Sequence, residues 1–115
     1  MGGLAVAIGA FGAHALKAML VAAGREDTFE LAVRYQFYHA LAMLIVGLLS
    51  RNNSSKLLQY SSLFFLLGIL IFCGSLYILC LTNRGWLGAI TPVGGIAFLA
   101  GWILLAVAMV KESSP

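Results

Sequence analysis

The sequence predicts an all-α integral membrane protein in which four transmembrane helices form an up-and-down bundle. Hydrophobic residues make up 62% of the 115 residues and charged residues 10%, whereas soluble domains average about 45–50% and about 25%. The mean hydropathy of +1.00 is typical of a chain surrounded largely by lipid. Four long apolar stretches occupy most of the sequence, so we expect residues 1–115 to form a single domain.

The four predicted spans are Gly2 to about Val21, Val33–Leu49, Leu57–Leu81, and about Thr91 to Val110. Each has roughly the 17–25 residues that a helix needs to cross about 30 Å of hydrocarbon. They lack the alternation of apolar and polar residues that is typical of outer-membrane strands. The first stretch has no basic segment before it, so we expect it to be a retained helix rather than a signal peptide.

The first loop carries most of the charged residues and predicts how the second helix begins. Asp27 and Glu30 have the spacing of a capping box, which predicts a helix start near Thr28 and a short helical extension before the second span. Glu30 and Arg34 then lie four residues apart on the exposed first turns. Lys17 is expected to pair with Asp27 or Glu30 at the membrane surface.

Small residues predict which helix faces pack closely, because helices in lipid associate through close contact rather than through a hydrophobic drive. In the third span a small or polar residue recurs every seven positions, at Ser61, Gly68, Ser75 and Thr82. On the first helix one face carries Gly3, Ala7, Ala10, His14 and Lys17. On the fourth helix the corresponding residues are Gly94, Ala97 and Gly101. We expect all three faces to lie at helix–helix contacts.

Polar residues gather in one half of the predicted bundle, toward the first loop. His14 lies about 5 Å past the middle of the first helix at 1.5 Å per residue, and His39 lies at a similar depth on the second. The candidate site residues that share this half are His14, Gln36, His39, Ser75, Tyr77 and Thr91. We expect His14 to point into the bundle and to hydrogen-bond the second helix or residues 75–77.

Several interpretations of this cluster remain open. Its members can be interhelical hydrogen bonds, worth about 0.6 kcal/mol each on average. Alternatively, His14 and His39 are axial ligands of a b-type haem. A quinone or lipid headgroup is a third interpretation, lying against Gln36, His39 and the positive start of the fourth helix. A proton relay through His14, Lys17 and Glu30 is a further possibility.

Several classes of chemistry find little support in the sequence. There is no GxSxG motif, no His–Asp pairing and no further ligand set for a zinc site, so we expect neither a hydrolase nor a metal centre. Cys73 and Cys80 lie about 10 Å apart along one helix, which is too far for a disulfide, and are expected to be buried small side chains. The basic residues are scattered, so nucleic-acid binding is not expected.

Four strings carry a family resemblance: GAFGAHAL (9–16), YQFYHALA (35–42), FCGSLYIL (72–79) and TPVGGIAFLAGW (91–102). Together they resemble the YgdD-type and transmembrane protein 256-like family of small four-span membrane proteins, a domain of unknown function. The resemblance implies a multi-pass protein of the bacterial cytoplasmic (inner) membrane and brings no accepted activity or cofactor. It implies that the family pattern includes His14, Gln36, His39, Gly74, Ser75, Tyr77, Thr91, Pro92, Gly94, Gly95 and Trp102. Cys73 departs from that pattern, since relatives usually carry Ser there.

The function expected from these observations is a non-enzymatic accessory or scaffolding subunit of a larger membrane complex. Its partners would be the lipid bilayer and other membrane subunits, or further copies of this chain. The alternative is a membrane-embedded protein that binds haem, quinone or lipid in a polar pocket around His14 and His39. Four spans place both termini on one side. The basic residues at the two ends of the bundle nearly balance, so the positive-inside rule does not decide which side this is. The resemblance implies the cytoplasm, because similar proteins carry a basic leader that is expected to stay inside.

Overall fold

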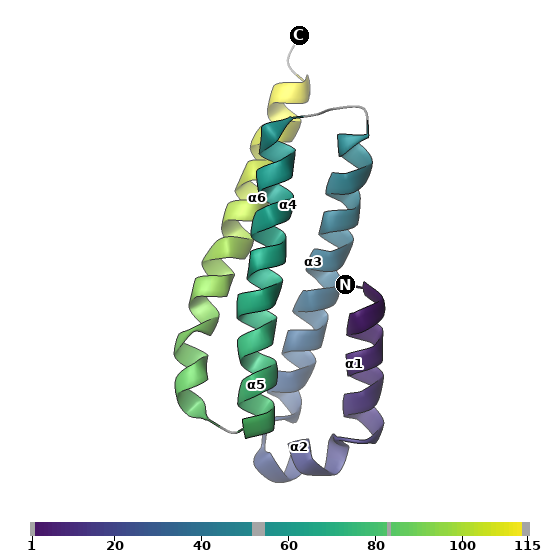
Figure 1. Ribbon diagram of the computed structural model, residues 1–115, viewed down its shortest axis with the longest axis vertical. Coiled ribbons are helices and arrows are strands. Elements are labelled where there is room, and N and C mark those ends of the chain that lie inside the picture. Colours follow the sequence, from purple (N-terminus) through teal and green to yellow (C-terminus); the bar gives the residue numbers. More distant parts are fainter. Residues whose placement is uncertain (1, 52–54, 83, 114–115) are drawn as a thin grey trace.

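The computed structural model describes residues 2–51, 55–82 and 84–113, and every regular element in these ranges is a helix (Figure 1). Its core consists of three long antiparallel helical segments, called rods below. The first is α3 (Glu26–Ser50), and the second, called the third span below, runs through α4 (Lys56–Gly68), the π-helix η1 (Ile69–Cys73) and α5 (Gly74–Thr82). The last rod is α6 (Thr91–Ser113), which follows the short 3₁₀ helix η2 (Gly85–Ala89).

These three rods are long and apolar enough to cross a membrane. They match the second, third and fourth predicted spans. Residues 52–54 and 83, in the segments that join these rods, lie outside the described residues.

The predicted first span is not one straight helix. It is divided into α1 (Gly2–His14) and α2 (Lys17–Ala23), whose axes differ by 74°. The amide of Leu16 donates to the carbonyl oxygen of Phe11, five residues back, at 3.1 Å, which closes the end of α1. By length and composition, the described residues therefore contain three helices that could cross a membrane, or four if the bent pair counts as one span.

The bend has a packing reason. It turns α2 across the end of the molecule, where Leu20 is 1% exposed and packs in a cluster with Phe29 and Cys80. A straight continuation of α1 would carry Leu20 away from these partners. Gly24, in the left-handed conformation with φ of 69°, ends α2 as a helix C-cap glycine.

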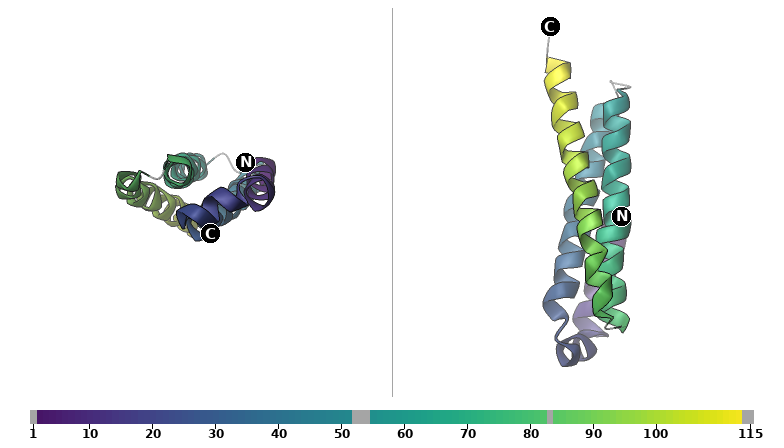
Figure 2. Two further views of the ribbon diagram at one scale, coloured as in Figure 1. Left: turned by 90° about the horizontal axis from the view of Figure 1, so that it is seen from below. Right: turned by 90° about the vertical axis from the view of Figure 1, so that its left-hand side faces the viewer.

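The helices are not arranged as the compact four-helix bundle that the sequence predicts. The molecule is flat, with extents of 57 × 26 × 14 Å. α1 packs mainly against α3, and Figure 2, seen from below, shows α1 at one edge and the third span and the start of α6 toward the other. Three helices thus form the core, and α1 flanks one of them.

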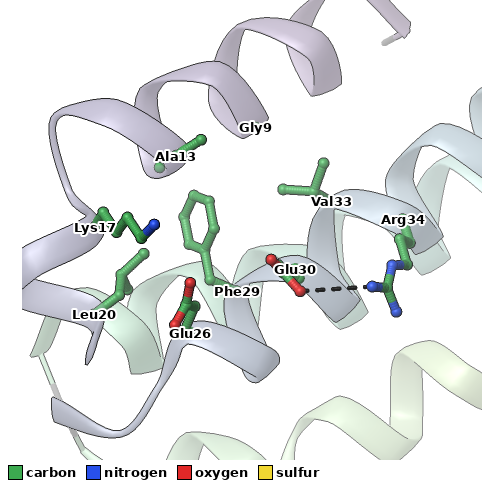
Figure 3. A pocket seen from close by; sticks show the side chains of 10 residues that line it. Gly9, Ala13, Lys17, Leu20, Glu26, Phe29, Glu30, Val33 and Arg34 are labelled. Carbon is green, nitrogen blue, oxygen red and sulfur yellow. Dashed lines mark ion pairs between the residues drawn. The ribbon is translucent and has the colours of Figure 1, made fainter. Parts of the chain in front are cut away.

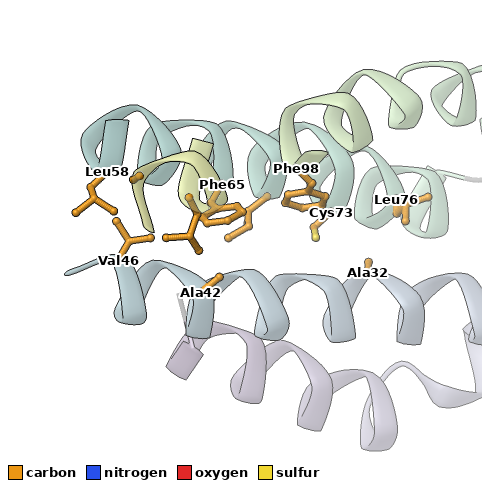
Figure 4. Close-up of a cluster of buried hydrophobic side chains, with 11 residues drawn as sticks. Ala32, Ala42, Val46, Leu58, Phe65, Cys73, Leu76 and Phe98 are labelled. Atoms are coloured by element: carbon orange, nitrogen blue, oxygen red, sulfur yellow. The ribbon is translucent and has the colours of Figure 1, made fainter. Parts of the chain in front are cut away.

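Buried side chains from all three rods fill the core between α3, the third span and α6 (Figure 4). Phe65 and Leu58 are fully buried there, and Phe98 is 4% exposed. Large apolar side chains such as Ile96 and Ile103 point outward instead, with more than half of their surface exposed. Outward apolar faces are expected where the surrounding solvent is lipid.

The predicted contact faces of the third span and α6 are confirmed except at Thr82. Ser61 donates to the carbonyl oxygen of Gly101 at 2.7 Å, Gly68 lies against the Phe98 ring, and Ser75 hydrogen-bonds Thr91. Three of the four seam residues therefore face α6. Thr82 does not, since it is exposed and donates to the carbonyl oxygen of Ile78 in its own helix. On α6 itself Gly94 and Gly101 are buried and Ala97 is half-buried.

The predicted contact face of the first helix is wrong. Its residues, Gly3, Ala7, Ala10, His14 and Lys17, are all exposed. α1 instead turns Ala5, which is 0% exposed, and Gly12 toward α3, where Gly12 lies against the Phe29 ring. At about 100° per residue, the predicted face lies on the opposite side of the helix from Ala5 and Gly12.

The first loop also differs in detail from its prediction. α3 begins at Glu26, with Arg25 at the cap position, so Asp27 lies in the first turn and does not cap the helix. The predicted pair of Glu30 and Arg34 is confirmed, at 3.5 Å between the charged atoms and with both side chains more than half exposed. Within the described ranges Lys17 forms no ion pair, so its predicted pairing with Asp27 or Glu30 is not found.

Candidate functional site

Five of the six predicted site residues lie in or beside the three-helix core. Gln36, His39 and Ser75 are 1%, 5% and 6% exposed, and Tyr77 and Thr91 are half-buried. Each takes part in a hydrogen bond that joins two different helices. The predicted convergence of polar groups from facing helices is therefore observed for these five.

His39 uses both ring nitrogens. Its Nδ1 lies 2.7 Å from the carbonyl oxygen of Tyr35 in the preceding turn of α3, and its Nε2 accepts from the indole Nε1–H of Trp102 on α6 at 3.1 Å. An indole nitrogen can only donate, so Nε2 is unprotonated and Nδ1 carries the hydrogen that the Tyr35 carbonyl accepts. These two bonds fix the neutral Nδ1–H tautomer and tie α3 to α6.

Aromatic rings enclose the His39 imidazole. Phe98 stacks on it with 3.6 Å between ring centroids and 10° between planes. Phe65 contacts it at 5.7 Å, and Trp102 meets it edge-on at 5.9 Å. Aromatic pairs contribute about 0.5–1.5 kcal/mol beyond their buried area, so this stack adds to the hydrogen bond in holding α3 against α6.

A second hydrogen bond ties α3 to the third span. The Tyr77 hydroxyl donates to Oε1 of Gln36 at 2.6 Å. Phe29 packs against the same tyrosine, with 5.5 Å between ring centroids. A Tyr ring suits this position because its apolar body fills the interface while its hydroxyl satisfies a buried amide.

A third hydrogen bond ties the third span to the start of α6. Ser75 Oγ and Thr91 Oγ1 are 2.7 Å apart. Ser75 donates its one hydrogen to the carbonyl oxygen of Phe72 at 3.0 Å, so it accepts from Thr91. Thr91 is the first residue of α6. Its hydroxyl is directed to Ser75 and to the carbonyl oxygen of Leu87, at 3.5 Å.

The π-helix η1 brings the third span unusually close to α6. The position of a Cβ atom on Gly94 would lie 2.7 Å from Cα of Phe72, so only glycine fits between the two backbones. The wide turn of a π-helix is rare and often marks a functional site. Here it sits between Ser61 and Ser75, the two polar anchors of the seam. The apolar sequence of η1, ILIFC, carries no signal that predicts it.

His14 lies outside this cluster, so the prediction that it points into the bundle is wrong. Its side chain is exposed, and no hydrogen bond of it is found within the described residues. It follows Gly12 by two residues, which places it about 200° around the helix from the face that contacts α3. The two histidines therefore do not face each other, and a haem held between them is not supported by this arrangement.

The described residues offer no group of three or more His, Cys, Asp or Glu side chains placed to hold a metal ion. Cys73 and Cys80 are buried free thiols, as expected for small core side chains. The polar groups of the core hydrogen-bond one another. These bonds hold the three helices in register.

Two residues of the site, Trp102 and Phe98, were not predicted as contributors from the sequence. Trp102 entered only through the family pattern, and Phe98 did not enter at all. A signal for Trp102 was present, because an indole N–H within an apolar span needs an acceptor and His39 is the acceptor nearest in depth. Phe98 is one of several Phe residues in apolar surroundings, and nothing in the sequence distinguishes it.

A cavity of about 540 Å³ opens beside the stacked rings, between α3 and α6. It is lined mainly by aromatic side chains, among them Tyr35, Tyr38, Phe72 and Trp102, together with His39. The surface of this cavity is almost entirely apolar, apart from the polar ends of its Tyr, His and Trp side chains. Within the described residues, the Tyr35 hydroxyl has no hydrogen-bond partner.

The regular elements of the described residues are all helices, and they include three or four apolar spans. Buried hydrogen bonds join three of these spans. This arrangement defines a polytopic α-helical membrane protein. The chain belongs to the family described as "Protein of unknown function (DUF423)", whose sequence profile matches residues 8–95. No solved structure matches it.

Named relatives agree with this assignment. A UPF0382 membrane protein of Staphylococcus haemolyticus is 43% identical over 108 residues, which cover 94% of this chain and 87% of the relative. The UPF0382 membrane protein YwdK of Bacillus subtilis is 41% identical over 109 residues (94% and 88%). The UPF0382 inner membrane protein YgdD of Escherichia coli is 39% identical over 106 residues (92% and 80%). The predicted family and the membrane setting are thus confirmed.

Proposed function

We propose that this protein is a non-enzymatic accessory or scaffolding subunit that packs against a larger assembly in the bacterial cytoplasmic membrane. The name of the Escherichia coli relative, an inner membrane protein, supports this location. The interior supports a structural role, because its polar side chains are used in hydrogen bonds between helices.

The observation that carries the proposal is the uncovered face of α1. Gly3, Ala7, Ala10 and His14 form a strip, called the α1 strip below, on the side of the helix opposite to α3. Small residues let another helix approach closely, and an imidazole facing lipid is costly unless a partner satisfies it. A transmembrane helix of another subunit would meet both requirements.

Ala10→Leu is expected to detach the protein from its assembly without unfolding it. Ala10 is exposed, so a larger side chain disturbs no contact of the chain itself, but it would hold a partner helix away. In native gels of mildly solubilised membranes, wild type should migrate well above its own 12.2 kDa, and the variant should migrate alone.

The matched control is Ala106→Leu, which makes the same change at an exposed position of α6. It should leave migration unchanged. Equal migration of wild type and Ala10→Leu would contradict the proposal. If the slower band contains only this chain, the partner is a second copy and the accessory role is wrong.

We further propose that α1 and α2 together form a broken first span, which gives four spans with both termini in the cytoplasm. α1 runs antiparallel to α3, as a first span of an up-and-down order must (Figure 1). The fluorescence of a C-terminal green fluorescent protein fusion and the accessibility of an N-terminal tag in sealed inverted vesicles should both report the cytoplasmic side. Termini on opposite sides would show three spans instead.

A second candidate function is the binding of a planar apolar ligand such as a quinone. It is favoured by the aromatic cavity between α3 and α6 and by the Tyr35 hydroxyl, which is available to a ligand carbonyl. Haem is a poorer fit than quinone, because the Nε2 lone pair of His39 that would bind iron already accepts from Trp102. A membrane lipid is a further candidate ligand, at this cavity or elsewhere on the chain.

A further inference from the structure

A second cavity, of about 390 Å³, lies where α1, α2 and the start of α3 meet (Figure 3). Its floor is apolar and comes from Gly9 and Gly12 of α1 and from Phe29 and Val33 of α3. Gly12 lies against the Phe29 ring, so α1 and α3 are close to each other at this point of the cavity. None of the polar core residues lines it.

Four charged side chains surround this floor: Lys17, Glu26, Glu30 and Arg34 (Figure 3). Two are basic and two acidic, so the cavity has no net formal charge. Glu30 and Arg34 pair with each other at 3.5 Å. Lys17 and Glu26 form no ion pair within the described residues, so the cavity presents one unpaired cation and one unpaired anion.

The cavity lies at the boundary between lipid and water. The charged residues of α3 are confined to its first nine positions, 26–34, and residues 35–50 contain no Asp, Glu, Lys or Arg. α2 crosses the end of the molecule at this level. The charged rim is therefore at headgroup depth, while the floor near Gly9 and Val33 extends toward the hydrocarbon.

We propose that this cavity binds the headgroup of phosphatidylethanolamine, with its phosphate at Lys17 and its ammonium at Glu26. A zwitterion supplies one negative and one positive group, which matches the two unpaired charges. A net anionic headgroup would satisfy Lys17 and leave Glu26 facing like charge. The primary ammonium donates hydrogen bonds to a carboxylate, whereas a choline group cannot and is usually held by several aromatic rings.

The apolar floor favours a membrane lipid over a soluble phosphoethanolamine ester. Phe29 and Val33 offer nothing to a free headgroup but contact the glycerol and the upper acyl chain of a lipid. This proposal is independent of the accessory role, because the cavity lies between α1 and α3 and the α1 strip faces away from α3.

The test uses the full chain, delipidated in detergent and then exchanged into nanodiscs with equal amounts of phosphatidylethanolamine, phosphatidylcholine and phosphatidylglycerol. Lipid retained after mild extraction is counted by native mass spectrometry. Wild type should retain phosphatidylethanolamine selectively. Lys17→Gln and Glu26→Gln should each lower that selectivity about tenfold, as expected for the loss of one charge-assisted contact.

Matched controls are available for both changes. Asp27→Asn alters the neighbouring acid, which does not line the cavity, and Lys56→Gln alters a lysine in α4, outside the cavity. Both should retain wild-type selectivity, and Lys17→Arg, which keeps the charge, should retain most of it. Glycerophosphoethanolamine added in solution should compete weakly, because it lacks acyl chains.

Three results would overturn the proposal. The first is a preference of wild type for phosphatidylglycerol or phosphatidylcholine. The second is equal lipid selectivity in wild type, Lys17→Gln and Glu26→Gln, and the third is competition by the soluble ester as strong as that by the lipid.

Discussion

Gly94→Ala is expected to destabilise the protein by about 3 kcal/mol or to prevent its folding. The added Cβ would lie 2.7 Å from Cα and Cβ of Phe72. Two of the neighbours are backbone atoms of the π-helix, which cannot turn aside as a side-chain tip would. The third span and α6 must therefore separate, and this weakens the contact between Ser75 and Thr91 as well.

Gly95→Ala is the matched control for this change. Gly95 is the next residue of α6, and a Cβ there meets nothing within 4 Å. Alanine is favoured over glycine in a helix interior by about 1 kcal/mol, so this variant should be as stable as wild type or more stable. The measurement is unfolding in mixed detergent micelles with increasing dodecyl sulfate, followed by circular dichroism. Equal midpoints for the two variants would show that the close approach at Gly94 is not formed.

His39→Leu is expected to lower the free energy of unfolding by about 2 kcal/mol, the second-largest effect. It removes the imidazole that accepts from the Trp102 indole and stacks on Phe98, and replaces it with an apolar side chain of similar volume. The indole N–H is then left without its partner inside the membrane. In a Trp86→Phe background Trp102 is the sole tryptophan, so its fluorescence should report the loss directly.

Two controls separate stability from ligand binding. Phe37→Leu, on the same helix but outside the cavity, should have little effect, since Phe37 is 38% exposed. Tyr35→Phe removes only the hydroxyl of a residue that lines the cavity and should leave stability unchanged. If Tyr35→Phe abolishes retention of a co-purified quinone while His39→Leu keeps the unfolding midpoint of wild type, the binding candidate replaces the accessory role. A wild-type midpoint for His39→Leu would contradict the structural role of His39.

The polar cluster could be predicted in part because period and depth are properties of the sequence. A residue that recurs every seven positions stays on one side of a helix, so Ser61, Gly68 and Ser75 had to share a face. Depth follows from counting residues along a span, which brought Gln36 and His39 to the level of Tyr77. The partner of His39 was harder to predict, because Trp102 lies 63 residues away and the bond depends on the rotation of two helices.

Composition and the length of the apolar runs were enough to predict a helical membrane chain, because both depend only on local chemistry. The pairing of Glu30 with Arg34 could also be predicted, since it acts within one or two turns of a single helix. Which face of α1 is buried depended instead on its packing against α3. Ala5 and Gly12 on one side and Ala7 and Ala10 on the other are equally small, so the choice was made by the fit of Gly12 against Phe29. The bend after His14 and the π-helix were likewise decided by packing between helices, which no local pattern encodes.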